Sequence, residues 1–340
     1  MSDTKAGIEK GSIRVGLWGS DSDTAFGSRK QTTPEVREGA FGSSSLAAFA
    51  EILYNQNNPC GQDPRKDYEL DSPSFVLSHP CSSEYWTQFG KAALENGIRG
   101  VVFVGAHWEE LDDRIRVATK TKPEIVQMDL VPRSYWENYP INIDLNLAET
   151  VADLLRAAGF PDVQEDPTFD WHDDTITPSR WMFPEGTPPA TVVSLNARYN
   201  PVFHVKIGRA LRELRKEGIL LCGTGGAVHN LYRNNWYPML TRGDNFQKGR
   251  TPAKWAIEFE KSVSDAVANN KVLTLHGQTP RYKDAHPTDD HFYPLLVIGG
   301  SVMEDDEYGK KMAQTWELQH MCNNQFVWGC WESASKAQVV

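Results

Sequence analysis

Short apolar runs alternate with amphipathic stretches along the chain from about residue 74 onward. Most of these runs are continuous and rich in β-branched residues, which is typical of strands buried on both faces of a sheet. The predicted strands are Ser74–Leu77, Gly100–Ala106, Arg114–Ala118, Thr191–Leu195, Ile219–Cys222 and Leu295–Ile298.

Helical periodicity occupies the intervals between these runs. The predicted helices are Glu84–Asn96, Leu145–Ala158, Val202–Glu217 and Pro252–Asn269. A glycine follows each of the first three, and glycine often ends a helix because it adopts positive φ without a Cβ clash. Strands that alternate with helices predict an α/β fold, with a central mostly parallel or mixed sheet flanked by helices on both faces.

The first 70 residues have a different composition, rich in Gly, Ser and Asp, with a single helix candidate around Ser45–Tyr54. Such a segment has little apolar area to bury in a core of its own. We therefore predict a polar, partly irregular N-terminal extension over residues 1–70. A single catalytic domain is expected over residues 71–325, and a C-terminal tail over residues 326–340.

Composition narrows the classes of partner. The 340 residues carry a formal net charge of −10 and show no basic stripe, which argues against nucleic acids and acidic membranes as partners. No apolar run is long enough to span a bilayer, and no secretory signal is visible. The five cysteines show no CxxC spacing, so a cytoplasmic protein with free thiols is expected. The oligomeric state is left open.

Histidines stand at or just beyond the ends of several predicted strands. His79 follows the run Phe75–Ser78, His107 follows Val101–Ala106, and His229 comes shortly after the glycine-rich turn that ends the strand at Ile219. Ligands of open α/β sheets collect at the carboxyl ends of the strands. These three imidazoles are therefore candidates to converge on one site.

Two further histidines fit this pattern. His172 lies in a polar loop before the strand at Thr191, and His291 directly precedes the apolar run at Leu295. A single histidine of this kind is more often structural, so the prediction depends on the whole set. Neutral imidazole suits Fe(II), Zn or Cu, and three protein ligands leave coordination positions open for substrate and O2. An additional histidine can carry protons near neutral pH.

Four motifs occur in one order along the chain. They are Ser-His-Pro-Cys-Ser at 78–82, Gly-Ala-His-Trp at 105–108, a glycine-rich turn followed by His-Asn-Leu at 223–231, and Pro-x-x-x-His followed by Pro-Leu at 287–295. The order and content of these motifs resemble the class III, LigB-type extradiol ring-cleavage dioxygenases, in particular their DOPA 4,5-dioxygenase-like branch. The resemblance covers roughly two thirds of the chain.

The resemblance implies a mononuclear non-haem Fe(II) centre that uses O2 to open a catechol-type aromatic ring beside its diol. His79, His107 and His291 would be metal ligands, and Zn(II) could occupy the same site. His229 would be either a fourth ligand or the catalytic acid/base. His172 would reach the substrate pocket as a second catalytic residue.

The substrate wall departs from the family pattern. The loop containing Trp171–Asp174 lacks the glycine of the family, and Val126–Leu130 replaces the family's His-Asp-Phe segment. We expect Trp108, Tyr139 and Gln127 to contact the substrate, and the substrate itself is not predicted to be DOPA.

Two other functions use the same residues. A zinc-dependent hydrolase could be built on a three-histidine site with a bound water, although no HExxH spacing is present. A non-catalytic metal-binding protein could also use this scaffold, because a fold does not determine a function.

Overall fold

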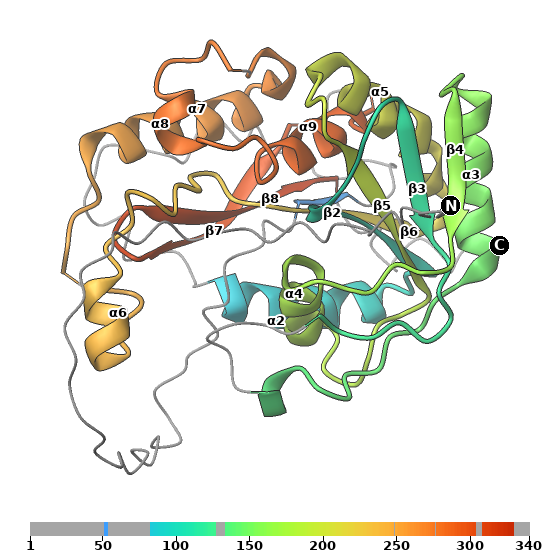
Figure 1. Ribbon diagram of the computed structural model, residues 1–340, viewed down its shortest axis with the longest axis horizontal. Helices are drawn as coiled ribbons and strands as arrows, with labels where there is room; N and C mark the ends of the chain where they lie inside the picture. The colour runs from blue at the N-terminus through green and yellow to red at the C-terminus, as the bar shows by residue number, and fades with distance from the viewer. Residues whose placement is uncertain are drawn as a thin grey trace, which may run out of the picture. The chain divides into compact units, whose positions relative to one another are not determined.

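The computed structural model describes residues 51–53, 82–126, 133–247, 249–275, 277–303 and 308–329. All of them belong to the unit Gly39–Val340, one of two compact units of the chain. Its centre is an eight-stranded sheet with the order β4-β3-β5-β2-β6-β1-β8-β7 (Figure 1). The strands are β1 (Glu51–Leu53), β2 (Gly100–Glu110), β3 (Arg114–Ala118), β4 (Asp162–Asp166), β5 (Ala190–Asn196), β6 (Ile219–Thr224), β7 (Lys310–Glu317) and β8 (Met321–Trp328).

The central strands run parallel, and this sets the position of the site. Strand β2 pairs in parallel with both β5 and β6, and Gly105 lies opposite Thr224. The pairs β3–β4 and β1–β8 are also parallel, whereas β1–β6, β3–β5 and β7–β8 are antiparallel. The carboxyl ends of β2, β5 and β6 therefore lie at one edge of the sheet, as the positions of the histidines require.

Helices cover both faces of this sheet, which confirms the predicted α/β class. Val102 and Val104 of β2 belong to one apolar core, whereas Val101 and Phe103 belong to the other. The first core contains residues of α3 (Leu145–Ala157), α5 (Pro201–Leu211), α7 (Lys254–Ala268) and α9 (Tyr293–Gly300). The second contains residues of α2 (Ser82–Glu95) and α4 (Asp173–Met182), on the opposite side in Figure 1. Two short helices, α6 (Tyr237–Arg242) and α8 (Tyr282–Ala285), complete the α-helices of the described ranges.

One predicted strand is wrong, because Leu295–Ile298 lies inside helix α9. A short, fully apolar run has no periodicity that separates a buried strand from a buried helix. Here the helix is buried on all sides, and Pro294 occupies its first turn. It packs closely on α5: a Cβ added to Gly208 would lie 1.8 Å from the carbonyl oxygen of Val297.

The N-terminal segment contributes to the sheet. Glu51–Leu53, expected in the helix around Ser45–Tyr54, instead forms strand β1 between β6 and β8. At the other end, β8 continues to Trp328. The sheet therefore contains residues that lie outside the predicted bounds of the catalytic domain, 71 and 325. The domain division as a whole stays a prediction. The predicted strand Ser74–Leu77 lies outside the described residues.

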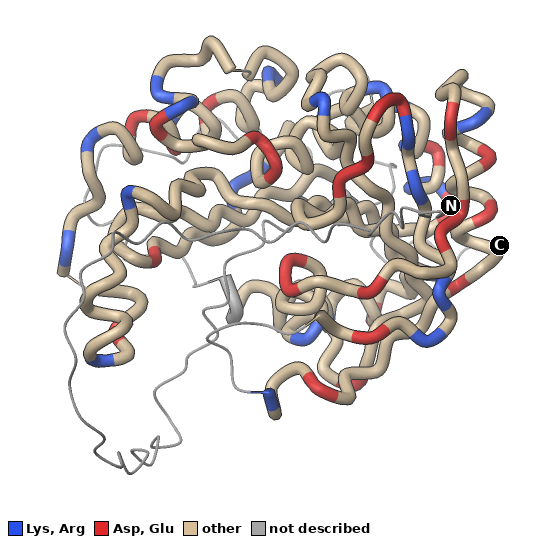
Figure 2. Tube along the Cα trace, viewed as in Figure 1, with Lys and Arg blue, Asp and Glu red and all other residues tan. Residues whose placement is uncertain are grey.

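Acidic and basic residues are interspersed over β3, β4 and α3 (Figure 2). Arg116 pairs with Asp162 at 3.1 Å, and Arg156 pairs with Asp153 at 2.8 Å. Exposed pairs such as the second contribute little to stability, since water screens them. Among the described residues, no helix combines the length and the hydrophobicity needed to cross a membrane.

Candidate active site

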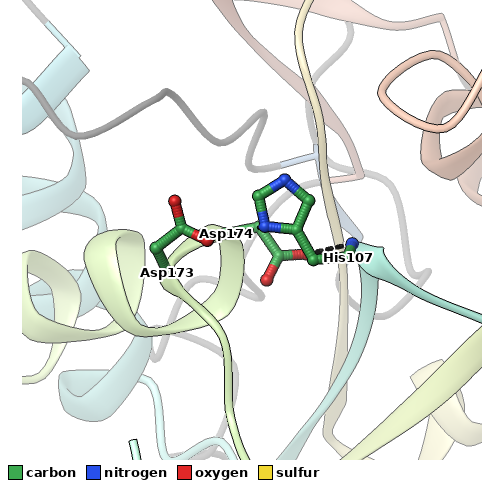
Figure 3. A group of neighbouring side chains, drawn as sticks. All are labelled: His107, Asp173 and Asp174. Atoms are coloured by element: carbon green, nitrogen blue, oxygen red, sulfur yellow. Dashed lines mark hydrogen bonds and ion pairs between the residues drawn. The ribbon is translucent and has the colours of Figure 1, made fainter. Parts of the chain in front are cut away.

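Strand β2 and helix α4 together fix the imidazole of His107. The carboxylate Oδ1 of Asp173 accepts a hydrogen bond from His107 Nδ1 at 2.6 Å, and Asp174 Oδ2 accepts one from the His107 backbone N–H at 3.0 Å. Figure 3 shows the two carboxylates at the start of α4 facing His107. A Cβ at Gly105 would lie 2.4 Å from Asp174 Oδ2, so this close approach of β2 and α4 requires glycine.

His291 is oriented by an equivalent contact. Its Nδ1 lies 2.6 Å from Oδ2 of Asp290. An ionised carboxylate only accepts hydrogen bonds, so each of the two histidines donates through Nδ1–H. When both rings are neutral, their Nε2 atoms carry lone pairs, and Nε2 of His107 lies 3.1 Å from Nε2 of His291.

This pair of nitrogens suits a metal ion. Two lone pairs that face each other repel unless a cation or a proton lies between them. Two cis nitrogen ligands at about 2.1 Å from one ion stand about 3 Å apart, close to the observed separation. Metal-binding histidines also typically donate their second ring N–H to a carboxylate, which fixes the tautomer and the ring orientation. The residues present therefore fit a mononuclear metal centre.

A third imidazole lies against this pair. The rings of His229 and His291 are parallel within 4°, with their centroids 3.6 Å apart. His229 is buried, and among the described residues its Nε2 has no hydrogen-bond partner. The backbone N–H of His229 donates to the carbonyl of Ala285. His229 is thus held close enough to the pair to serve as a ligand or as a proton carrier.

The glycine turn before His229 brings two chain segments together. The backbone N–H of Gly226 donates to the carbonyl oxygen of His291 at 2.9 Å. A Cβ at Gly225 would lie 2.2 Å from that oxygen, whereas a Cβ at Gly226 would lie 3.4 Å from the nearest side-chain atom.

We therefore expect Gly225→Ala to displace His291 and to lower the free energy of unfolding by about 1–3 kcal/mol, as in other overpacked sites. The matched variant Gly226→Ala should change it by less than about 1 kcal/mol, because its Cβ has room. Urea denaturation of both variants measures the difference. Equal stabilities would show that the turn yields without moving His291.

Asp173 and Asp174 lie close enough to His107 that one atom from each could hold an ion. Their oxygens already have partners, however. Asp173 binds the His107 ring, and Asp174 accepts from the backbone N–H groups of His107 and Thr175. We interpret both carboxylates as groups that orient His107.

The surroundings of His107 and His229 shift their pKa values in opposite directions. Burial alone would lower the pKa of His107, but the carboxylates of Asp174 and Asp173 raise it to about 9. Burial would raise the pKa of Asp290, but the hydrogen bond from His291 lowers it below its ordinary range. Burial, with His291 and His286 nearby, lowers the pKa of His229 well below its usual value. His229 is therefore neutral at pH 7, and its free nitrogen can accept a proton or a metal.

The structure places the remaining predicted residues as follows. The ring of His172 lies 6.2 Å from that of His107, so His107, His172, His229 and His291 form one cluster. Trp108 stacks on Phe169, with centroids 3.8 Å apart. Tyr139 is buried, and its hydroxyl contacts the carbonyl oxygens of Ser179 and Phe183 at the end of α4. His79 and Gln127 lie outside the described residues, so their predicted roles stay predictions.

Sequence reasoning missed Asp173, Asp174, Asp290 and Phe169. The two aspartates after His172 carry a usable signal, since acidic residues concentrate in the first turn of a helix. That turn begins α4, and His172 is its N-cap. The adjacency of Asp290 and His291 is a weaker signal, because neighbouring side chains often point apart.

Comparison with known proteins identifies the family. Residues 61–327 match the catalytic LigB subunit of aromatic ring-opening dioxygenases. The chain is 28% identical to a 4,5-DOPA dioxygenase extradiol of Beta vulgaris. The similarity extends over 212 residues, which are 62% of this chain and 75% of that protein. It is 28% identical to the dioxygenase tasH of Hapsidospora irregularis, over 62% of this chain and 66% of that one. A 4,5-DOPA dioxygenase extradiol of Escherichia coli is 26% identical, over 68% and 82% of the two chains.

A solved structure shares the fold. An uncharacterized protein of Escherichia coli, JW3007, superposes with a TM-score of 0.58 over 74% of this chain and 93% of its own, at 21% identity. The matched family segment includes β2, β6, α4 and the loop before α9, which carry the histidine cluster. This chain belongs to the LigB family and is an extradiol-type aromatic ring-opening dioxygenase.

Proposed function

We propose that this dioxygenase depends on mononuclear non-haem Fe(II) and opens a catechol-type ring beside its diol. The observation that carries the proposal is the pair of Nε2 atoms of His107 and His291, 3.1 Å apart, with the opposite nitrogen of each ring held by a carboxylate. Zinc would fit the same nitrogens, but it has no redox chemistry with which to use O2.

The ligand set would consist of His107 and His291, with His79 as the third member predicted from the sequence. Imidazole ligands suit Fe(II), and three of them leave positions for a bidentate diol and for O2. The iron would supply a binding site for both reactants and a path for electrons from the ring to O2. Asp173 and Asp290 would keep the two imidazoles in the ligating tautomer.

His229 would be the general acid/base of the reaction. Its imidazole is neutral, because burial lowers its pKa, and it lies against His291. It can take the proton of a diol hydroxyl as the substrate binds, and return it to an oxygen atom when the O–O bond breaks. The reaction balances without another reductant, since both atoms of O2 enter the ring-opened product. His172, whose ring lies 6.2 Å from that of His107, would be the second proton carrier.

The substrate is proposed as a catechol of undefined substitution. The relatives named for DOPA share the family segment, but Val126–Leu130 and Trp171–Asp174 differ from the family motifs that contact substrate. Trp108 stays a proposed substrate-wall residue. Tyr139 is a less suitable one, because its hydroxyl donates to Ser179 and Phe183 at the end of α4 opposite His172. A cytoplasmic location stays a prediction. A zinc hydrolase is the less favoured alternative, since the family match is to ring-opening dioxygenases.

The test is anaerobic loading of the apoprotein with Fe(II) or with Zn(II), followed by oxygenated catechols that differ in their ring substituents. We expect Fe(II)-loaded protein to consume one O2 per ring opened and to produce the yellow absorbance of a semialdehyde. Resorcinols are the matched control, because their hydroxyls cannot chelate one metal ion. Absence of O2 uptake across the catechol panel would contradict the proposal, as would equal activity with Zn(II).

A further inference from the structure

The imidazole of His172 is held differently from the other histidines of the site. His107 and His291 are each fixed by a carboxylate at 2.6 Å. The backbone carbonyl of His172 accepts hydrogen bonds from Thr175 and Ile176, which anchors its main chain at the start of α4. Its side chain makes no capping hydrogen bond to the first turn of α4. The contacts that the structure gives this ring are with other rings, those of His107 and Phe169.

Phe169 provides the packing surface. Its ring lies 5.6 Å from the His172 ring at an interplanar angle of 20°, and 3.8 Å from the Trp108 ring at 14°. Trp108 is buried in the core under α2 and α4 and follows His107 directly in β2. The three near-parallel rings thus link the orientation of His172 to the strand that carries a metal ligand.

The chain around Phe169 is itself held rigidly. The carboxylate of Asp170 accepts from Lys120 Nζ and from the Glu124 backbone N–H, each at 2.6 Å. Trp171 is fully buried, and its backbone N–H donates to the carbonyl of Glu124. These contacts fix the backbone next to Phe169, and the stacking on Trp108 fixes its ring, so Phe169 can define the position of a neighbouring ring.

We propose that Phe169, backed by Trp108, is a positioning residue that holds the His172 imidazole in its catalytic orientation. The inference rests on the proposed function, in which His172 carries protons. An aromatic pair contributes about 0.5–1.5 kcal/mol beyond the area it buries, enough to favour one orientation of the ring by a few-fold to tenfold. A misplacement of about 1 Å can cost about a hundredfold in rate.

Phe169→Leu keeps an apolar side chain but removes the ring surface. We expect kcat to fall by about 10- to 100-fold with little change in KM, and Phe169→Tyr, which keeps the ring, to restore most of the rate. The matched control is Phe203→Leu, which removes from α5 the ring that pairs with Phe160. It should leave kcat unchanged, and thermal unfolding of all variants monitors folding.

A double-mutant cycle separates positioning from structural damage. If Phe169 acts through His172, adding Phe169→Leu to His172→Gln should change kcat by no more than about twofold. A further 10-fold loss in that background would overturn the proposal.

Histidine-labelled NMR of the zinc-loaded protein tests positioning without turnover, and His172→Gln assigns the signal. Phe169→Leu should shift and broaden the His172 ring signal, whereas Phe169→Tyr should preserve it. An unchanged signal in Phe169→Leu would overturn the proposal even if the rates fell. If the iron-loaded wild type opens no catechol, the proposed function fails, and the NMR result still decides whether Phe169 positions His172.

Discussion

Alanine at His107 or at His291 is expected to leave the protein folded and to remove most of its bound iron. Each substitution removes one of the two Nε2 atoms, which face each other at a distance of 3.1 Å. The remaining imidazoles and water chelate an ion weakly, so the affinity for Fe(II) should fall by more than about 100-fold. Iron content after dialysis against a weak chelator, together with titration calorimetry under nitrogen, measures the loss.

Graded variants make this prediction specific. Asp173→Asn and Asp290→Asn keep both ligating nitrogens but remove the carboxylates that orient them, so we expect a weaker loss of about 10- to 100-fold in affinity. His320→Gln is the matched control, because His320 accepts a hydrogen bond from the backbone N–H of Ala253 and stands outside the cluster. It should bind iron normally. Full iron occupancy in His107→Ala or His291→Ala would remove that residue from the ligand set.

Glutamine at His229 is expected to keep the iron and the catechol but to slow turnover by about 10²–10⁴, the usual contribution of a positioned proton carrier. A fourth protein ligand would occupy a position that substrate and O2 need. The neutral, buried imidazole of His229 is suited instead to exchange a proton with the bound diol. Glutamine has a similar size and polarity but cannot carry a proton. Stopped-flow measurement of catechol binding and of ring opening separates the two steps.

The opposite result is equally informative. If His229→Gln loses its iron as completely as His107→Ala, His229 is a ligand and the acid/base role passes to His172. His229→Gln and His172→Gln should then be compared at equal iron content, because a loss of metal alone would lower both rates. A His229→Gln variant with full iron and an unchanged rate would exclude both roles.

Much of the site could be predicted from local sequence. His107 and the turn before His229 follow apolar strands, and parallel strands bring their carboxyl ends to one edge, so the convergence of these two segments follows from order and pattern. His291 was predicted in the same site, although the run after it is a helix and not a strand. The wrong strand prediction does not change the position predicted for His291, because the turn at Gly225 and Gly226 holds this residue against β6.

Other parts of the fold carry no local signal. Three consecutive polar residues, Asn323, Asn324 and Gln325, interrupt the apolar pattern of β8. They are buried, and their partners include Glu260 on α7 and Trp86 on α2. A buried polar strand is stabilised by partners far away in the chain, and periodicity cannot reveal them. Strand β4 is polar for a different reason, because it lies at the edge of the sheet and most of its residues are partly or fully exposed.

The sequence by itself determined the α/β class and the gathering of His107, His172, His229 and His291, because hydrophobic period and the small residues before His107 and His229 act over a few residues. Only the tertiary structure decided which atoms of those histidines face one another. That choice depends on Asp173 and Asp290 and on the stacking of Phe169 against Trp108 and His172. Asp173 and Phe169 contact His107 and Trp108 from a segment more than 60 residues away, so no pattern along one segment encodes these contacts. Even the adjacent Asp290 sets the tautomer of His291 only because the folded chain turns its carboxylate toward the ring.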